Sequence, residues 1–259
     1  MNRYRQAIQN YWEFNNNQCP HYSECKKNIV YKGCNSIYDK FCFDRARVGE
    51  YYGENPKLPR IVIIGVEGIH DRQYIECTTA PSLSAGNPHY CGVRYVLSYL
   101  LSDFREKDKP EPGKIKNVVP WIEEALKNYA LCNLYCCAFV PENDKERTRN
   151  LYHSIEMQEN CVERLYNEIK ILKPNIVIIQ AINPFTDIMR NKFIQYFNIK
   201  TDPHFSERKA KLGIGSVENQ KCIFVETYHG STPWFGQKYI TNTLNPLLDE
   251  VIKKVKEQI

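Results

Sequence analysis

Two polar segments of the sequence come directly after buried, strand-like runs and carry side chain types that do chemistry. The first is GVEGIHD, residues 65–71, where the aliphatic run of residues 61–66 ends. It places Glu67 between Gly65 and Gly68. A carboxylate in that place can orient a water molecule or stabilise a cationic transition state, and glycine lets a ligand approach the backbone. The alternative is that Glu67 caps the next helix. The segment matches neither GxxxxGK[ST] nor GxGxxG, so we expect no nucleotide cofactor.

The second polar segment, TYHGSTPWFG, places His229 after a strand-like run and before a flexible Gly-Ser pair. A lone histidine is more often structural than catalytic, but this position favours a functional role. Pro233, Trp234 and Phe235 follow. These three residues either pack the final helix or form an apolar wedge that unstacks a base pair.

Charge alone does not identify a partner. The 259 residues include 35 Lys+Arg and 30 Asp+Glu, a mild excess of +5. The one local cluster, Arg208, Lys209 and Lys211, lies in a glycine-containing stretch. It is either a solvated loop or a set of phosphate contacts.

Eleven cysteines in a chain of this size indicate metal ligands rather than disulfides if the compartment is reducing. Four thiolates from two distant segments suit an iron–sulfur cluster. They are Cys34, Cys42, Cys137 and Cys161. The alternative is a zinc site built by the first four cysteines, whose spacing lacks the short pairs typical of zinc modules. Those four are Cys19, Cys25, Cys34 and Cys42. We expect Cys77, Cys91, Cys132 and Cys222 to be small buried hydrophobic residues.

The composition is that of a globular protein and excludes disorder as a description of the whole chain. Hydrophobic residues make up 42% and charged residues 25%. The longest aliphatic run, residues 61–66, is too short to cross a bilayer, and the amino terminus lacks the apolar core of a secretory signal. We therefore expect a cytoplasmic monomer with no membrane partner.

Four short aliphatic runs alternate with helix-like segments and predict a three-layer αβα fold with a mostly parallel four-stranded sheet. The expected strands are 61–66, 131–139, 176–180 and 222–226. The expected helices are 1–14, 93–104, 115–129, 155–172, 184–197 and 236–257. Residues 1–58 form an amino-terminal helix and cysteine-rich segment, and 59–259 the α/β domain. The carboxyl ends of parallel strands share one edge, where the polar segments should converge.

The order of these features over residues 34–240 resembles the uracil-DNA glycosylase superfamily, especially its iron–sulfur branch. Cys34 and Cys42 occupy the region of that branch's first cysteine pair. The sequence NLYCCAFVP, residues 133–141, followed by Cys161, is similar to its asparagine-bearing and CRPP-type segments. TYHGS resembles its TYHPS-type closing motif, and NPHYCG, residues 87–92, resembles its segment with a base-stacking aromatic residue.

The resemblance implies a DNA glycosylase that flips a nucleotide out of DNA and hydrolyses its glycosidic bond, as in DNA repair. It implies that Glu67 and His229 are catalytic, that Asn133 reads a pyrimidine edge and that Tyr90 stacks on the base. Further base contacts are expected from Gly65, Val66, Gly68, Ile69 and His70. DNA contacts are expected from Ser231, Pro233, Trp234, Phe235, Arg208, Lys209 and Lys211. The implied cofactor is a 4Fe-4S cluster held by Cys34, Cys42, Cys137 and Cys161.

Departures from the family pattern suggest an unusual substrate. Glycine replaces proline at Gly68 and Gly230, and Ile69 stands where related enzymes carry a tyrosine that excludes 5-substituted pyrimidines. We therefore expect a uracil-like or 5-modified base, such as a hypermodified viral cytosine in antiviral defence. The first cysteine pair is C-x₇-C instead of C-x₂-C, so Cys19 or Cys25 could replace Cys34. The alternatives are an inactive DNA-binding protein on this fold and a metal or redox enzyme that uses the cysteines.

Overall fold

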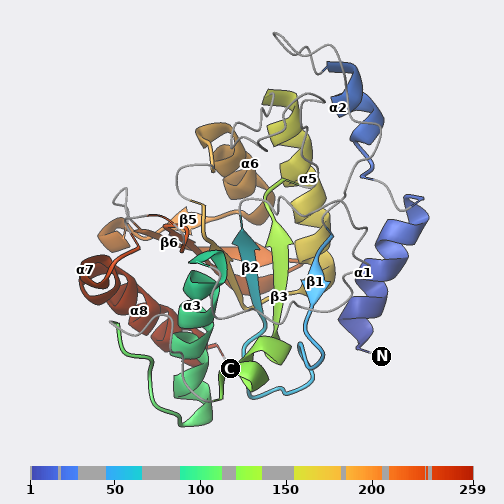
Figure 1. Cartoon of the computed structure of the whole chain (residues 1–259). Coiled ribbons are helices and arrows are strands. Elements are labelled where there is room, and N and C mark those ends of the chain that lie inside the picture. Colours follow the sequence, from blue (N-terminus) through green and yellow to red (C-terminus); the bar gives the residue numbers. More distant parts are fainter. Residues whose placement is uncertain are drawn as a thin grey trace.

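The computed structural model describes ten parts of the chain. They are residues 2–16, 19–28, 45–65, 88–112, 121–135, 155–181, 185–205, 210–230, 232 and 235–258. Within these parts, helices surround a single mixed sheet (Figure 1).

The sheet has seven strands in the order β1-β3-β2-β4-β7-β6-β5. Its centre is parallel and consists of β3 (Tyr129–Asn133), β2 (Ile61–Gly65), β4 (Ile176–Ile179) and β7 (Gln220–Thr227). Antiparallel strands extend both edges: β1 (Arg47–Val48) on one side, and β6 (Ala210–Val217) with β5 (Lys200–Thr201) on the other. The four aliphatic runs therefore form the parallel centre as predicted, but the prediction of a four-stranded sheet is wrong.

Strand β6 shows why the sequence underestimates the sheet, because it lies in the stretch interpreted as a loop. Glycines at 213 and 215 interrupt its apolar alternation. A Cβ on Gly213 would lie 2.5 Å from Cγ2 of Ile199, and one on Gly215 would lie 2.5 Å from the Phe197 carbonyl oxygen. The two glycines thus let β6 pass close to the end of α6 (Asp187–Phe197). This is a requirement of tertiary packing, and local propensity does not reveal it.

Most long helices agree with the sequence pattern. They are α1 (Arg3–Phe14), α3 (Pro88–Arg105), α5 (Ile155–Leu172), α6 and α8 (Asn245–Lys256). The helix predicted at 115–129 is confirmed in most of its described part, where α4 (Ile122–Ala125) is followed by the short 3-10 helix η1 (Leu126–Asn128), but it ends before Tyr129, the first residue of β3. Tyr129 already pairs with Ile61, so pairing within the sheet overrides helical periodicity there. The remaining short elements are α2 (Tyr22–Asn28), η2 (Pro203–Phe205), α7 (Gln237–Tyr239) and η3 (Ile240–Leu244).

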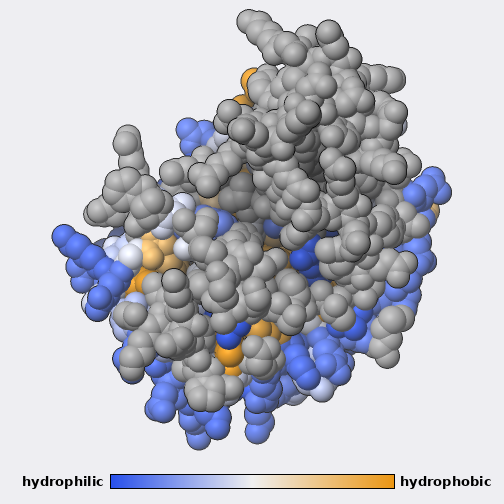
Figure 2. Space-filling view, in the orientation of Figure 1, coloured by the Kyte–Doolittle hydropathy of each residue, from blue (hydrophilic) through white to orange (hydrophobic). Residues whose placement is uncertain are grey.

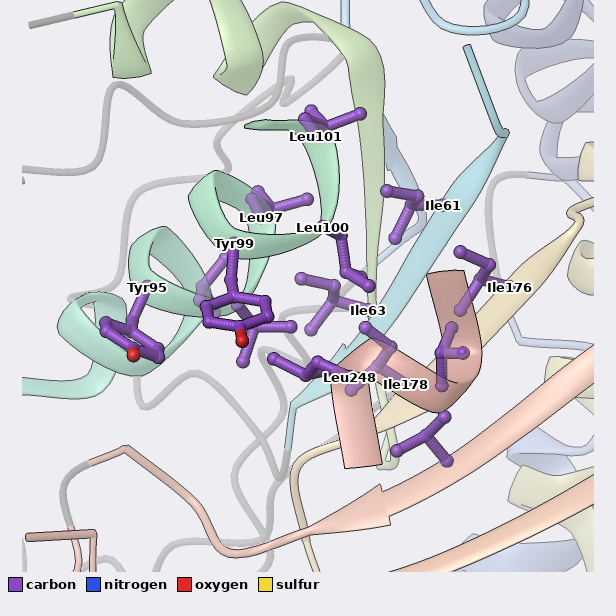
Figure 3. Packing of buried hydrophobic residues seen from close by; sticks show 14 of the residues in the cluster. Ile61, Ile63, Tyr95, Leu97, Tyr99, Leu100, Leu101, Ile176, Ile178 and Leu248 are labelled. Carbon is purple, nitrogen blue, oxygen red and sulfur yellow. The ribbon is translucent and has the colours of Figure 1, made fainter. Parts of the chain in front are cut away.

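Alternate residues of β2 belong to two different hydrophobic clusters, because successive side chains of a strand point to opposite faces. Ile61 and Ile63 pack in a cluster with residues of α3 and α8. Figure 3 shows these two isoleucines beside Leu100 of α3. Val62 and Ile64 belong to the second cluster, with residues of α1, α5 and α6. Helices thus bury apolar side chains against both faces of the parallel strands.

A buried ion pair on α5 fixes the carboxyl end of β3. Arg164 and Glu168 are fully buried, and Nη1 of Arg164 lies 2.6 Å from Oε2 of Glu168. Nη2 of the same guanidinium donates to the backbone carbonyl oxygens of Asn133 and Leu134. One cation therefore satisfies a carboxylate and two carbonyl groups where β3 ends.

The other oxygen of Glu168 holds the amino-terminal part of the chain. Its Oε1 accepts hydrogen bonds from Nε1 of Trp12 at 3.0 Å and from the backbone N–H of Ala46 at 3.2 Å. Trp12 lies on α1, and Ala46 comes just before β1. The pair on α5 thus connects α1, the approach to β1 and the end of β3.

No helix in the described ranges is long and apolar enough to cross a membrane. In the space-filling view, hydrophilic residues lie around the rim of this face, and small hydrophobic areas lie between them (Figure 2).

Replacing Arg164 by methionine should destabilise the protein strongly, because Glu168 and two carbonyl groups lose their buried cationic partner. We expect the free energy of unfolding in urea to fall by about 3–5 kcal/mol. Lys253→Met, which removes a largely exposed cation, should change it by less than about 0.5 kcal/mol. The double variant R164M/E168L should remain destabilised, because the N–H groups of Trp12 and Ala46 and the carbonyl groups at the end of β3 then lack their buried partners. An R164M protein as stable as the wild type would contradict this role.

Candidate active site at the carboxyl edge of the sheet

Four residues form a row across the carboxyl edge of the parallel strands. Gly65 pairs with Asn133 of β3. On the other side, Gln180 comes directly after β4, and its backbone N–H donates to the carbonyl oxygen of Ile64 at 2.9 Å. Thr227 ends β7 at the same level. The order along the edge is therefore Asn133, Gly65, Gln180 and Thr227.

The side chains of this row belong to the face that α3 covers. On each strand the residue two positions earlier packs in the cluster with α3 and α8: Leu131, Ile63, Ile178 and Val225. Because side chains alternate along a strand, the row should continue that face. One measured approach agrees with this, since a Cβ on Gly92 of α3 would lie 3.5 Å from Nε2 of Gln180.

Asn133 is bound through its backbone carbonyl by the arginine of the buried ion pair. Its side chain is buried, and its backbone carbonyl accepts a hydrogen bond from Arg164 on α5. The Leu134 N–H donates to the Gly65 carbonyl oxygen at 2.8 Å, which ties the exits of β3 and β2 together. The backbone at Asn133 is thus held by hydrogen bonds on both sides.

His229 follows β7 by two residues and starts a tight turn. Its carbonyl oxygen accepts from the backbone N–H of Thr232 at 3.0 Å and from the Thr232 hydroxyl at 2.8 Å. The side chain is partly buried, and this burial lowers the pKa of the imidazole from its ordinary value. Burial thus favours the neutral imidazole, whose ring N–H donates a hydrogen bond without carrying a charge.

The start of α3 contacts the loop that carries His229. A Cβ on Gly92 would lie 2.6 Å from the Cα of Gly230, so the two backbones meet where neither residue has a side chain. Tyr90, the expected stacking residue, belongs to the first turn of the same helix, although its side chain lies outside the described part. The NPHYCG and TYHGS segments thus meet at Gly92 and Gly230.

Two of the expected DNA-contacting residues have ordinary structural positions. Phe235 is buried in the cluster with α3 and α8, with its ring centroid 5.8 Å from that of Tyr239. It therefore packs the end of the chain, which favours the core-packing alternative for this residue over the apolar wedge. Lys211 lies on β6 in register with Glu226, so it is a partly exposed strand residue and not part of a loop.

The described cysteines bring the amino-terminal segment close to α5. Asn160 donates from Nδ2 to Sγ of Cys25 at 3.5 Å, and the next residue on α5 is Cys161. Cys19 packs in the same hydrophobic cluster as Cys161. Burial raises the pKa of the Cys25 thiol, and the nearby Cys19 adds to the effect. Cys25 thus lies beside α5, which carries Cys161, and Cys19 belongs to the same hydrophobic cluster as Cys161. These are the two cysteines that could replace Cys34 as the first ligand of the cluster.

Among the residues that the structure describes, no three His, Cys, Asp or Glu side chains gather closely enough to hold a metal ion. Cys132 and Cys222 are buried in the hydrophobic cluster on the α5 face, as predicted.

Many of the expected site residues lie outside the described residues. They are Cys34, Cys42, Val66, Glu67, Gly68, Ile69, His70, Cys137, Arg208, Lys209, Ser231, Pro233 and Trp234.

The structure also adds three residues that the sequence analysis does not identify. Gln180 ends an aliphatic run that predicts a strand, and its place at the carboxyl edge is where ligands bind in parallel sheets. Arg164 and Glu168 have the i, i+4 spacing of an ordinary surface ion pair, which does not indicate that they are buried.

No model of a known protein family matches this chain, and no curated protein matches it.

The lowered pKa of His229 predicts how stability depends on pH. The unfolded chain binds more protons than the folded one between the lowered pKa and the ordinary value, so stability falls as the pH drops below about 6.5. The His229→Gln variant should lack this component, which is at most about 1.4 kcal/mol per pH unit. Urea unfolding of both proteins over this pH range measures it. Parallel stability curves for wild type and variant would contradict the assignment.

Proposed function

We propose that the protein is a DNA glycosylase that flips a nucleotide out of DNA and hydrolytically removes a uracil-like or 5-modified pyrimidine base, leaving an abasic site. The observation that carries the proposal is the convergence of Asn133, Gly65 and His229 at one edge of the parallel strands. These residues come from the segments that resemble the glycosylase motifs. An amide, a glycine and a neutral imidazole at one edge suit the recognition of a flat polar base.

The glycosylase-like three-layer αβα architecture belongs to the same proposal. Its support is the parallel order β3-β2-β4-β7 and the packing of helices against both faces of these strands. The additional strands β1, β5 and β6 lie at the edges, where they leave the parallel centre and its carboxyl edge intact.

Base recognition would follow from the row of residues at the edge. A base inside a duplex cannot reach the protein, so the nucleotide must be flipped at a cost of a few kcal/mol. The Asn133 amide would hydrogen-bond the Watson–Crick edge of the flipped base, and Tyr90 would stack on its face. Trp234, with Pro233, would fill the space left in the DNA, since Phe235 is committed to the core.

Cleavage of the glycosidic bond builds positive charge on the sugar and negative charge on the departing base. Glu67 would stabilise the sugar cation and position the attacking water. His229 would donate a hydrogen bond to an oxygen of the base. Because its imidazole is neutral, it can stabilise the leaving group without prior protonation. A preorganised donor of this kind contributes roughly 10²–10³ in rate.

Acceptance of a 5-substituted base would depend on the first motif. Ile69 stands in the place of an excluding tyrosine, and Gly68 in that of a proline. The second proline replacement, Gly230, acts differently. A Cβ on Gly92 would lie 2.6 Å from the Cα of Gly230, so this glycine lies where α3 approaches the His229 loop closely. Room for a larger base would therefore come from the GVEGIHD segment.

The cysteines would hold a 4Fe-4S cluster, with zinc as the alternative. Supporting this, Cys19, Cys25 and Cys161 are buried cysteines, and Cys25 contacts Asn160, the neighbour of Cys161 on α5. Cys161 would be joined by Cys137 and by two cysteines of the amino-terminal segment, with Cys19 or Cys25 in place of Cys34. The cluster would cross-link that segment to α5, since hydrolysis of a glycosidic bond transfers no electron.

The reaction is tested by incubating the full chain with duplexes that contain uracil, a mismatched thymine, or a hydroxymethylated or glucosylated cytosine, and then cleaving abasic sites with alkali. We expect cleavage at the modified position by the wild type. Glu67→Gln should bind the same DNA but release no base, because its side chain is no longer an anion. Glu218→Gln, which changes an exposed carboxylate paired with Lys173, should behave as the wild type. Full activity of the Glu67→Gln variant would remove Glu67 from the mechanism.

The cluster is tested by metal content. We expect iron and sulfide in the purified protein, with the brown colour of an iron–sulfur cluster, and loss of iron in Cys161→Ser. Cys222→Ser is the matched control because Cys222 is equally buried but lies on β7. Equal iron in both variants would exclude Cys161 as a ligand, and zinc in place of iron would favour the alternative.

A further inference from the structure

Gln180 is a buried amide at the carboxyl edge to which neither the motifs nor the proposed mechanism gives a role. The residue is 1% exposed, and within the described part of the chain its Nε2 atom has no hydrogen-bond partner. Its backbone is fixed, because its N–H donates to the carbonyl oxygen of Ile64 at 2.9 Å. Buried polar groups are rarely left unpaired, so this amide indicates a partner that binds from outside the chain.

The unpaired end of Gln180 lies where α3 meets the loop of His229. Its Nε2 lies 3.5 Å from the position of a Cβ on Gly92, and the backbone nitrogen of Gly230 lies 3.1 Å from the same position. Gly230 directly follows His229, which would donate to the base in the proposed mechanism. The amide of Gln180 and the backbone N–H of Gly230 are therefore neighbours at this point of the edge.

The N–H of Gly230 is a second donor that the described structure does not use. The turn is closed by Thr232, whose backbone N–H and hydroxyl both donate to the carbonyl oxygen of His229. Among the described residues, no backbone hydrogen bond uses the N–H of Gly230. The motif that TYHGS resembles has proline at this place, and proline has no N–H. Glycine thus gives the loop a donor that the motif lacks, next to the unpaired amide.

Two uncharged N–H donors at one place suit an acceptor atom on which negative charge develops. The proposed reaction produces such an atom. The bond between C1′ of the sugar and N1 of the base breaks, and its electron pair leaves with the base. The charge is then shared between the ring nitrogen and the oxygen atoms of the base. Water supplies the hydroxyl group at C1′ and the proton that finally neutralises the base.

We propose that Gln180 and the N–H of Gly230 form a donor pair that hydrogen-bonds an oxygen of the base and stabilises its negative charge as it leaves. The inference rests on the proposed glycosylase function and deepens it, because it assigns further catalytic groups at the same site. Loss of one preorganised donor should slow base release by about 100- to 1,000-fold, while the affinity for DNA stays the same.

The test measures single-turnover release from duplexes that carry uracil, 5-fluorouracil, 5-hydroxymethyluracil or 5-hydroxymethylcytosine, together with binding of the same DNA. Gln180→Met removes the amide and keeps an unbranched side chain of similar length. We expect it to bind DNA as the wild type does but to release base about 100- to 1,000-fold more slowly. Among the bases released, the deficit should be smallest for 5-fluorouracil, because fluorine stabilises the departing anion. Gln195→Met, at an exposed position of α6, should keep the wild-type rates.

Further variants test the backbone donor and the direction of the hydrogen bond. Gly230→Pro removes the N–H, whereas Gly230→Ala keeps it, so the proline variant should release base about 100-fold more slowly than the alanine variant. The two ends of a carboxamide are assigned by their surroundings, and Gln180→Glu separates donor from acceptor. An ionised glutamate only accepts, so this variant should be at least as slow as Gln180→Met.

The results that overturn the inference are distinguishable from failure of the proposed function. Base release at the wild-type rate by Gln180→Met or Gln180→Glu would show that the amide does not donate to the base, and the glycosylase function would stand. If the wild type releases no base from any duplex, the proposed function fails together with the inference.

Urea unfolding adds an independent check. Gln180→Met should be at least as stable as the wild type, because it removes an unpaired buried amide. A large loss of stability, with the same rate deficit for every base released, would show that Gln180 has a structural partner and would overturn the inference.

Discussion

The rest of the molecule depends on the interactions that the buried guanidinium group of Arg164 makes. It binds Glu168 on its own helix and two carbonyl groups at the end of β3, and Glu168 in turn binds Trp12 and Ala46. A charge removed from water is tolerated only when its partners are complete, so each of these segments must be in place for the others to be stable. The arrangement explains how an amino-terminal segment distant in sequence is fixed to the same helix that carries Cys161. The same guanidinium also positions Asn133, because it binds the backbone carbonyl group of this residue.

The candidate site combines this rigid support with unusually close backbone contacts. The parallel strands bring Asn133, Gly65, Gln180 and Thr227 to one level. On the α3 side, the contact of Gly92 with Gly230 brings the helix onto the His229 loop. Burial keeps the imidazole neutral. Polar groups are thus held in fixed positions by strands and a helix, which is the condition for both selective binding and transition-state stabilisation.

The sequence predicted the parts of the fold that depend on strong local patterns. Four aliphatic runs predicted the parallel strands, and their polar exits predicted the edge where Asn133 and His229 lie. The parts it missed depend on tertiary contacts. Strand β6 is hidden by Gly213 and Gly215, which allow its close approach to the end of α6, and the predicted helix ends at Asn128 because Tyr129 pairs within the sheet. Phe235 belongs to the core, and Arg164 and Gln180 became visible only through burial, which composition and spacing do not encode.

The central claim is that this edge of the sheet releases a pyrimidine base from DNA. Mass spectrometry of the small molecules released by the full chain from duplexes with one defined pyrimidine tests it most directly. The account predicts a free base and an abasic strand in equal amounts. DNA that is bound by the protein but yields no free base from any of these duplexes would contradict it.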